Sequence, residues 1–366
     1  MKGGENVIVF FLLYMVLCLY GVKIHKNLNR DYLSMDNTQS IKGIFIVLVF
    51  FSHFNSYVSY SGSFDILYYR IISMFGQTMV TLFLFYSGYG IMESINKKGI
   101  SYVKQIPGNR VLKTLFRFAC AVFIFFLIGT FAIGQKYTLR KVLFSLVGWD
   151  SIGNSNWYIF VIMVLYLITY MSFRFLMQKN RIIPIIISCV TIMVLIALDV
   201  VYRVKTYTWV DSALCYIAGM AYSQYRKKLE AIINKNNLIY CAITFIALLA
   251  LAFLKYRFDA RNIVSRVTLN LCFAGVMVLL TMRVTLKNKI LMWCGKNLFE
   301  IYILQRIPMM VFQNIGLADF NIYLYFVVCV AFTVAMVWPF KFVTERLWRM
   351  LGKMPLLFKR KKSELI

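Results

Sequence analysis

The sequence predicts an all-α protein that crosses a membrane many times. Of its 366 residues, 61% are hydrophobic and only 15% are charged, whereas soluble domains contain about 25% charged residues. The mean hydropathy is +0.71. These values exclude an ordinary soluble enzyme, a disordered chain and a disulfide-stapled scaffold. The net charge of +27 raises the question of nucleic acid, but the basic residues come in short clusters between apolar segments, so we expect no nucleic-acid partner.

Eleven apolar segments are long enough to be candidate spans, since a spanning helix needs about 20 residues. Helices are expected because lipid offers no partners for backbone polar groups, and the apolar runs lack the alternation of a membrane barrel. The first segment has no small-residue cleavage site, so we expect it to be retained and not removed as a signal peptide. The expected spans are 6–22, 41–60, 71–95, 111–133, 155–175, 182–202, 209–225, 238–255, 262–282, 297–316 and 320–343.

The distribution of basic residues predicts the orientation. If the N-terminus lies outside, most of the 41 Lys and Arg residues fall in cytoplasmic connections, including the KRKK run at 359–362, as the positive-inside rule requires. We therefore expect the N-terminus outside and the C-terminus in the cytoplasm of a multi-pass cell-membrane protein. The predicted regions are an added helix and loop over 1–40, a membrane domain over 41–345 and a basic tail over 346–366.

Lys42 and His53 are the first candidates for chemistry. They are eleven residues apart, close to three helical turns, so they lie on one helix face about 16 Å apart along the axis. We expect Lys42 at the cytoplasmic end of its span and His53 deep in the membrane, where ionisable residues usually line a polar cavity and mark function. The alternative is a structural histidine bonded to a neighbouring helix carbonyl. His25 is the only other histidine, and none of the eight cysteines forms a C-x-x-C pair, so we expect no metal site.

A family resemblance begins at these two residues. A basic residue, ten intervening residues and a histidine resemble the acyltransferase-3 family of integral-membrane O-acyltransferases. The segments TLFLFYSGYGIMES (81–94), NWYIFVIMVLY (156–166) and CGKNLFEIYILQ (294–305) resemble later motifs of that family in order and spacing. The resemblance implies a core of about ten helices, to which the first span adds one. This chain departs from the family at Lys42, where Arg is common, and at Gln305, where many members have a second histidine.

The resemblance also implies roles. It implies that His53 is the general base that takes the proton of an acceptor hydroxyl, a task that suits an imidazole. The implied donor is acyl-CoA, most simply acetyl-CoA, and cations on the cytoplasmic side would hold its phosphates; the expected ones are Lys42, Arg110, Lys113 and Arg117. The implied acceptor is a cell-surface glycan or its lipid-linked precursor.

Further side chains are candidates for lining the cavity: Glu300, Tyr302, Gln305 and Trp157. The simplest account of Glu300 is an ion pair with Lys296, four residues earlier on the helix; the alternative is that it orients His53 or binds acceptor hydroxyls. Gly88, next to Ser87, is expected to let two helices approach closely. The competing functions are a lipid or glycan flippase, which normally shows interrupted helices in two halves, and a sensor or scaffold in which His53 is structural.

Overall fold

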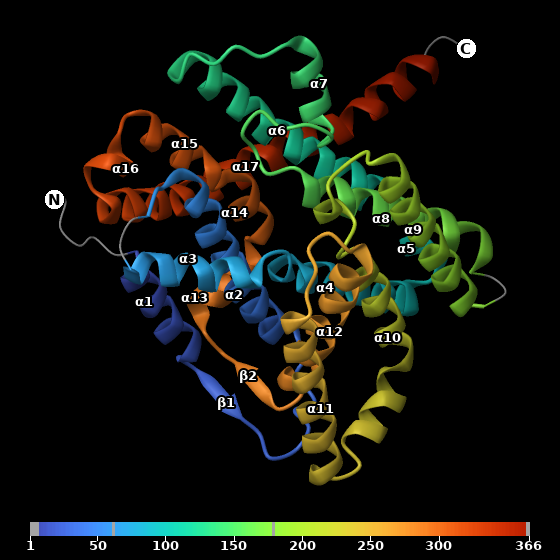
Figure 1. Ribbon diagram of the computed structural model, residues 1–366. Helices are drawn as coiled ribbons and strands as arrows, with labels where there is room; N and C mark the ends of the chain where they lie inside the picture. Colours follow the sequence, from blue (N-terminus) through green and yellow to red (C-terminus); the bar gives the residue numbers. More distant parts are fainter. Residues whose placement is uncertain (1–6, 61–62, 178–179, 364–366) are drawn as a thin grey trace.

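The computed structural model describes residues 7–60, 63–177 and 180–363, and this part of the protein is a helix bundle (Figure 1). The chain is 79% helical, which confirms the predicted all-α class. Eight helical segments in the described residues are long and apolar enough to cross a membrane. They are Met35–Tyr57, Phe64–Lys98, Ile100–Ala132, Trp157–Leu176, Ile182–Tyr202, Asn237–Tyr256, Ile263–Thr281 and Ile322–Gly352.

The helical elements follow one another in this order: α1 (Ile8–Leu19), α2 (Met35–Phe54), η1 (Asn55–Tyr57), α3 (Ser63–Phe75), α4 (Thr78–Lys98), α5 (Ile100–Ile106), the π-helical turn η2 (Pro107–Leu112), α6 (Lys113–Leu127), the π-helical turn η3 (Ile128–Ala132), α7 (Leu139–Leu146), α8 (Trp157–Leu176), α9 (Ile182–Tyr202), η4 (Tyr207–Trp209), α10 (Leu214–Ile233), α11 (Asn237–Tyr256), α12 (Ile263–Thr281), α13 (Lys289–Lys296), α14 (Leu298–Leu304), α15 (Arg306–Asn314), α16 (Leu317–Phe320) and α17 (Ile322–Ser363).

Three of the eleven expected spans differ from full apolar helices, so a count of eleven is not confirmed. The first is α1, whose 12 residues are fewer than the roughly 20 that a span needs. The expected span over 209–225 is α10, which runs to Ile233 and carries the charged run RKKLE in its second half. The expected span over 297–316 is divided into α14 and α15.

A short antiparallel sheet joins the segment after α1 to the segment after α12. Strand β1 (Val22–Ile24) pairs with β2 (Val284–Leu286), with Val22 opposite Leu286. Each strand has only three residues, and a strand this short leaves no recognisable alternating pattern in the sequence. The sheet places the connections after α1 and after α12 at the same end of the bundle, as the expected topology requires (Figure 1).

Glycines bring two pairs of helices into backbone contact. A Cβ atom at Gly43 in α2 would lie 1.8 Å from the carbonyl oxygen of Leu291 in α13, and one at Gly295 in α13 would lie 1.8 Å from the carbonyl oxygen of Gln39. The two glycines therefore let α2 and α13 touch through their backbones, as small residues do in membrane bundles.

The same arrangement joins α4 to α10. A Cβ atom at Gly88 would lie 1.9 Å from the carbonyl oxygen of Tyr216, and one at Gly219 would lie 2.0 Å from that of Phe85. The close approach expected at Gly88 is thus confirmed. These contacts fix α2 and α4, the helices that carry Lys42 and Ser87.

We expect Gly88→Ala to destabilise the protein, because the new methyl group would overlap a backbone carbonyl that cannot move alone; overpacking of this kind costs about 1–3 kcal/mol or more. Gly90→Ala is the matched control, since Gly90 is exposed in the same helix with no atom within 4 Å of its Cβ position. The control change should be neutral or stabilising by up to about 1 kcal/mol. Thermal unfolding of the purified variants in detergent measures both, and equal unfolding temperatures would contradict the close packing.

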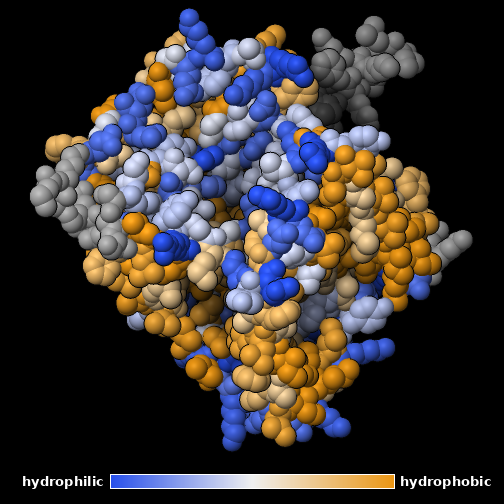
Figure 2. Space-filling model, viewed as in Figure 1, coloured by the Kyte–Doolittle hydropathy of each residue, from blue (hydrophilic) through white to orange (hydrophobic). Residues whose placement is uncertain are grey.

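The surface divides into polar ends and an apolar band. In Figure 2, apolar side chains cover the lower part of the face around α11 and α12, while polar side chains gather above α3 and project at the bottom edge. The windows of α11 and α9 that are most apolar have only 11% and 22% of their residues buried. Exposed Leu, Ile and Phe side chains in such numbers need lipid around them, so the protein is a membrane protein.

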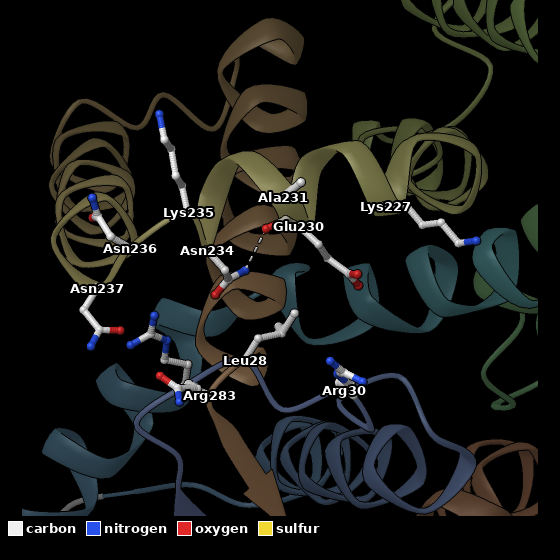
Figure 3. Close-up of a pocket in the computed structure, with 11 residues that line it drawn as sticks. Leu28, Arg30, Lys227, Glu230, Ala231, Asn234, Lys235, Asn236, Asn237 and Arg283 are labelled. Carbon is white, nitrogen blue, oxygen red and sulfur yellow. Dashed lines mark hydrogen bonds between the residues drawn. The ribbon is translucent and has the colours of Figure 1, made fainter.

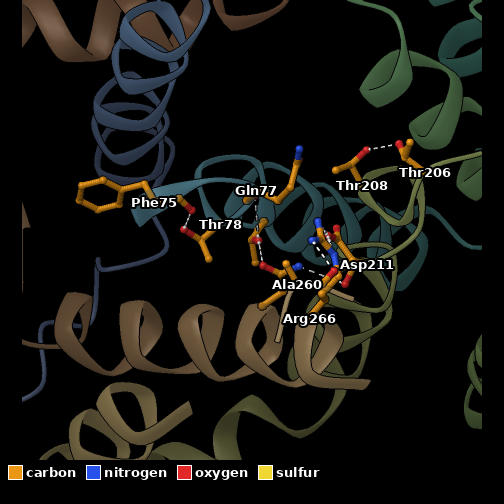
Figure 4. Close-up of polar contacts among 10 residues, drawn as sticks. Phe75, Gln77, Thr78, Thr206, Thr208, Asp211, Ala260 and Arg266 are labelled. Carbon is orange, nitrogen blue, oxygen red and sulfur yellow. Dashed lines mark hydrogen bonds and ion pairs between the residues drawn. The ribbon is translucent and has the colours of Figure 1, made fainter. Parts of the chain in front are cut away.

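One ion pair closes the end of the bundle opposite the sheet. Arg266 in α12 donates from Nε to Oδ2 of Asp211 at 2.9 Å, and the amide of Asn270 donates to the backbone carbonyl of Asp211 at 3.1 Å. Figure 4 shows Asp211 and Arg266 facing each other across the connection before α10. These contacts tie the α9–α10 connection to α12.

Candidate active site

Helix α2 positions both His53 and Lys42. The start of the helix is capped by Ser34, whose side chain accepts a hydrogen bond from the backbone N–H of Asn37. The negative charge of Asp36 in the first turn interacts favourably with the helix dipole. Lys42 lies seven residues after the first residue of α2, and His53 is the last residue but one. The helix begins earlier than the expected span over 41–60, because the polar segment from Met35 to Ser40 is also helical; the depth of His53 in the membrane stays a prediction. The shared face is confirmed, since α2 is continuous between the two residues.

The His53 ring lies inside the bundle, in contact with α14 and the residue that follows it. Its Nδ1 is 2.9 Å from Nε2 of Gln305, and its ring centre is 6.0 Å from that of Tyr302. Tyr302 packs edge-on against Tyr158 at 5.4 Å. Gln305, Tyr302 and Tyr158 are buried, while His53 is half-buried. Of the four predicted lining residues, Gln305 and Tyr302 are thus brought to His53.

The break between α14 and α15 explains the position of Gln305. Pro308 has no N–H to donate to the carbonyl of Leu304, four residues earlier, so the regular helix ends there. Gln305 keeps helical backbone angles (φ −57°, ψ −28°), and its fully buried side chain reaches His53. The sequence predicted one unbroken span here and missed the break.

The side chains of Lys42 and Arg110 form a cationic pair, and Lys42 lies about three helical turns before His53 along α2. The Lys42 Nζ lies 5.6 Å from the centre of the Tyr86 ring in α4, and Arg110 is close enough to act on it electrostatically. Arg110 is exposed, and its Nε donates to the Tyr102 hydroxyl at 3.2 Å. It lies in η2, a π-helical turn that begins at Pro107; such turns are frequent at functional sites. The structure therefore brings together two of the four predicted donor-binding residues.

The other two predicted donor-binding residues are placed differently. Arg117 makes an ion pair with Glu300, and its guanidinium lies 4.8 Å from the Phe299 ring centre. Lys113, the first residue of α6, is half-buried. Since the charge of Arg117 is neutralised by Glu300, Arg117 is less available to a donor phosphate than Lys42 or Arg110.

The predicted ion pair between Glu300 and Lys296 was wrong. Residues four apart meet only on a continuous helix, and here α13 ends at Lys296 and α14 begins at Leu298. Asn297 between them has φ −108° and ψ 24°, which turns Lys296 away from the next helix. The buried Glu300 pairs with Arg117 of α6 instead and so joins α14 to α6.

Trp157, the fourth predicted lining residue, begins α8 and packs edge-on against Tyr158 with ring centres 6.1 Å apart. Its neighbour Tyr158 is the residue that contacts Tyr302. Sequence reasoning also missed Arg306 and Tyr57; the Arg306 guanidinium is 5.6 Å from the Tyr57 ring centre. Helical spacing could have found both, since Tyr57 comes four residues after His53 and Arg306 four residues after Tyr302, whereas no spacing relates Tyr158 in α8 to α2.

A separate polar pocket lies at the sheet end of the bundle. It has a volume of about 750 Å³ and is lined by residues from the connection after β1 and from the turn between α10 and α11. Figure 3 shows Glu230 and Asn234 of this pocket joined by a hydrogen bond from the Asn234 amide to the Glu230 backbone carbonyl, with Arg30 and Arg283 lying below them in the view. Glu230 also accepts from the Tyr32 hydroxyl at 2.8 Å. The pocket contains none of the predicted site residues. In the described residues, no group of three or more His, Cys, Asp or Glu side chains could hold a metal ion.

Taken with the fold, the site defines a class: a multi-pass membrane protein with a histidine inside its helix bundle and a lysine on the same helix face. The family model described as an acyltransferase domain matches residues 37–341, most of the chain. The protein therefore belongs to the acyltransferase-3 family, as its motifs indicated. No curated protein matches the chain significantly. The same is true of solved structures.

Proposed function

We propose that this protein is a membrane O-acyltransferase that moves an acetyl or another short acyl group from acyl-CoA to a hydroxyl of a cell-surface glycan or a lipid-linked glycan precursor. Membership of the acyltransferase family establishes the general activity. The observation that carries the proposal is the half-buried His53 inside the bundle, held at Nδ1 by Gln305.

His53 has the surroundings that a general base needs. The base must offer a free lone pair to the acceptor hydroxyl. When the Gln305 amide presents its oxygen to His53, Nδ1 carries the proton and donates, which leaves Nε2 free to act as the base. When Nε2 faces the ring, Oε1 has no hydrogen-bond partner and Nε2 also donates to the Tyr302 carbonyl at 3.5 Å, so rotation of the amide gives up only that long bond. Gln305 thus acts as a positioning residue that selects the tautomer.

Lys42 and Arg110 support acyl-CoA as the donor. CoA carries anionic phosphates, which Lys and Arg bind, and no ion pair in the described residues engages either cation. Lys42 and His53 are about 16 Å apart along α2, so a long pantetheine arm is needed to reach from one to the other. The proposed orientation puts the N-terminus outside and the C-terminus in the cytoplasm, where the donor is made.

Lys42→Met should weaken donor binding, because a phosphate would lose one of its two cations. We expect KM for acetyl-CoA to rise about 10-fold or more, which corresponds to roughly 1.4 kcal/mol, with a smaller change in kcat. Lys289→Met is the control, since Lys289 is exposed at the start of α13. Steady-state kinetics of purified protein decide the outcome, and an unchanged KM in Lys42→Met would contradict this assignment.

The glycan acceptor is inferred from the family resemblance. Tyr302, Gln305 and Trp157 are the residues proposed to contact it, and Tyr158 joins them because it packs against Tyr302. The acceptor would reach His53 from the end of the bundle opposite the sheet. Glu300 is left out of the acceptor site, since its carboxylate is engaged by Arg117.

A flippase or other transporter is the second candidate, and one observation favours it. Transporters often have interrupted helices around their binding site, and here η2 interrupts the segment Ile100–Ala132 while α14 and α15 divide another. Incubation of the purified protein with acetyl-CoA and an extracted glycolipid fraction separates the two functions. Release of free CoA thiol supports the transferase, whereas glycolipid movement across vesicles without thiol release would overturn it.

A further inference from the structure

Arg306 lies beside His53, and one nitrogen of its guanidinium makes no hydrogen bond. It is the first residue of α15 and is half-buried. Its Nε is buried without a hydrogen-bond partner, and the guanidinium carbon Cζ lies 5.6 Å from the Tyr57 ring centre. It is close enough to His53 to act on the imidazole electrostatically. The four ion pairs found in the described ranges do not include Arg306.

Tyr302 also presents an unpaired polar atom. Tyr302 lies four residues before Arg306, and the helical backbone angles of Gln305 between them keep both side chains on one face. The Tyr302 hydroxyl is buried without a hydrogen-bond partner. Buried polar groups in native proteins are almost always paired, so unpaired donors at positions 302 and 306 beside one histidine indicate a place for a polar ligand that accepts hydrogen bonds.

The charges indicate the sign of that ligand. When His53 takes a proton it becomes a cation next to the Arg306 guanidinium, and two like charges in a buried site repel strongly. A negative charge between them removes the repulsion. Acyl transfer generates such a charge in the same step, on the carbonyl oxygen of the thioester.

We propose that Arg306, assisted by Tyr302, forms an oxyanion site beside His53 that binds a negatively charged oxygen of the reacting substrates. This inference rests on the proposed function. The acceptor oxygen attacks the thioester carbon and its proton passes to His53, while the carbonyl electron pair moves onto the oxygen that Arg306 faces. When the C–O double bond re-forms, the C–S bond breaks and the CoA sulfur takes the proton from His53. An acidic group of the acceptor is the other source of negative oxygen, and the experiment below distinguishes the two.

The test compares two reactions of purified Arg306→Gln and Arg306→Lys: release of CoA from acetyl-CoA with water as acceptor, and transfer of labelled acetyl to an extracted glycolipid fraction. If the oxygen is that of the thioester, Arg306→Gln lowers kcat about 10²–10³-fold in both reactions, and Arg306→Lys loses less because it keeps the charge. If the oxygen belongs to the acceptor, the water reaction is unchanged and KM for the glycolipid rises. Either result supports the site.

Unchanged rates and KM values in both reactions would overturn the oxyanion site. Arg261→Gln is the matched control, since Arg261 is exposed in the connection before α12, and it should behave as the unaltered protein. Added methylguanidinium should restore part of the activity of Arg306→Ala, which a purely structural role of Arg306 would not allow. Failure of the unaltered protein to release CoA would instead contradict the proposed function, so the two failures are distinguishable.

Discussion

Replacement of His53 by alanine is expected to lower acyl transfer by at least 10²–10⁴-fold, the usual contribution of a general base. The physical reason is that the acceptor hydroxyl must lose its proton as it attacks, and His53 is the histidine that the fold places inside the bundle. The ring is held at Nδ1 by Gln305 at 2.9 Å and packs beside Tyr302. The change removes a half-buried ring, so we expect the variant to insert and fold. Release of CoA by the purified variant measures the effect.

His25→Ala is the matched control for this experiment. The chain has only two histidines, and His25 lies next to the small sheet, where its Nε2 is 2.8 Å from the Thr285 hydroxyl. Its loss should leave the rate of acyl transfer unchanged. A His53→Ala variant that is as active as His25→Ala would show that the imidazole inside the bundle is structural.

Arg117→Met should be strongly destabilising, because it leaves Glu300 buried without a partner. Breaking a buried ion pair in this way typically costs about 3–5 kcal/mol. The double variant Arg117→Met with Glu300→Gln should recover much of the stability, since no uncompensated charge then remains. Thermal unfolding in detergent and the yield of monodisperse protein report the change.

The control for the buried pair is Arg349→Met. Arg349 pairs with Glu345 at 3.8 Å on the exposed end of α17, where the Arg349 side chain is 77% exposed. Exposed pairs contribute about 0–1 kcal/mol, so this variant should unfold almost as the unaltered protein does. If Arg117→Met were no less stable than Arg349→Met, the ion pair would not hold α14 against α6.

The sequence predicted the helical class well because lipid leaves a chain little choice. An apolar segment in a membrane must satisfy its backbone internally, so composition alone identifies α8, α9, α11, α12 and α17. Helical periodicity was also enough to place Lys42 and His53 on one face. These features depend on local sequence and do not require knowledge of which helices are neighbours.

The features that the sequence missed depend on helix ends and on distant neighbours. The break at Asn297 changed the partner of Glu300 from Lys296 to Arg117, and Pro308 divided a segment that reads as one apolar span. Tyr158 of α8 contacts Tyr302 of α14, and Arg306 of α15 contacts the Tyr57 ring of η1. The backbone contacts at Gly43, Gly88 and their partner glycines fix how α2 meets α13 and how α4 meets α10, and such contacts link residues far apart in the chain.

The most direct test of the account is mass analysis of surface glycans and their lipid-linked precursors. Three samples are compared, from cells with the intact protein, with His53→Ala and without the protein. We predict that a glycan species heavier by one acyl group occurs only in cells with the intact protein. Identical glycan masses in all three samples, with the protein present in the membrane, would contradict an acyltransferase that modifies glycans through His53.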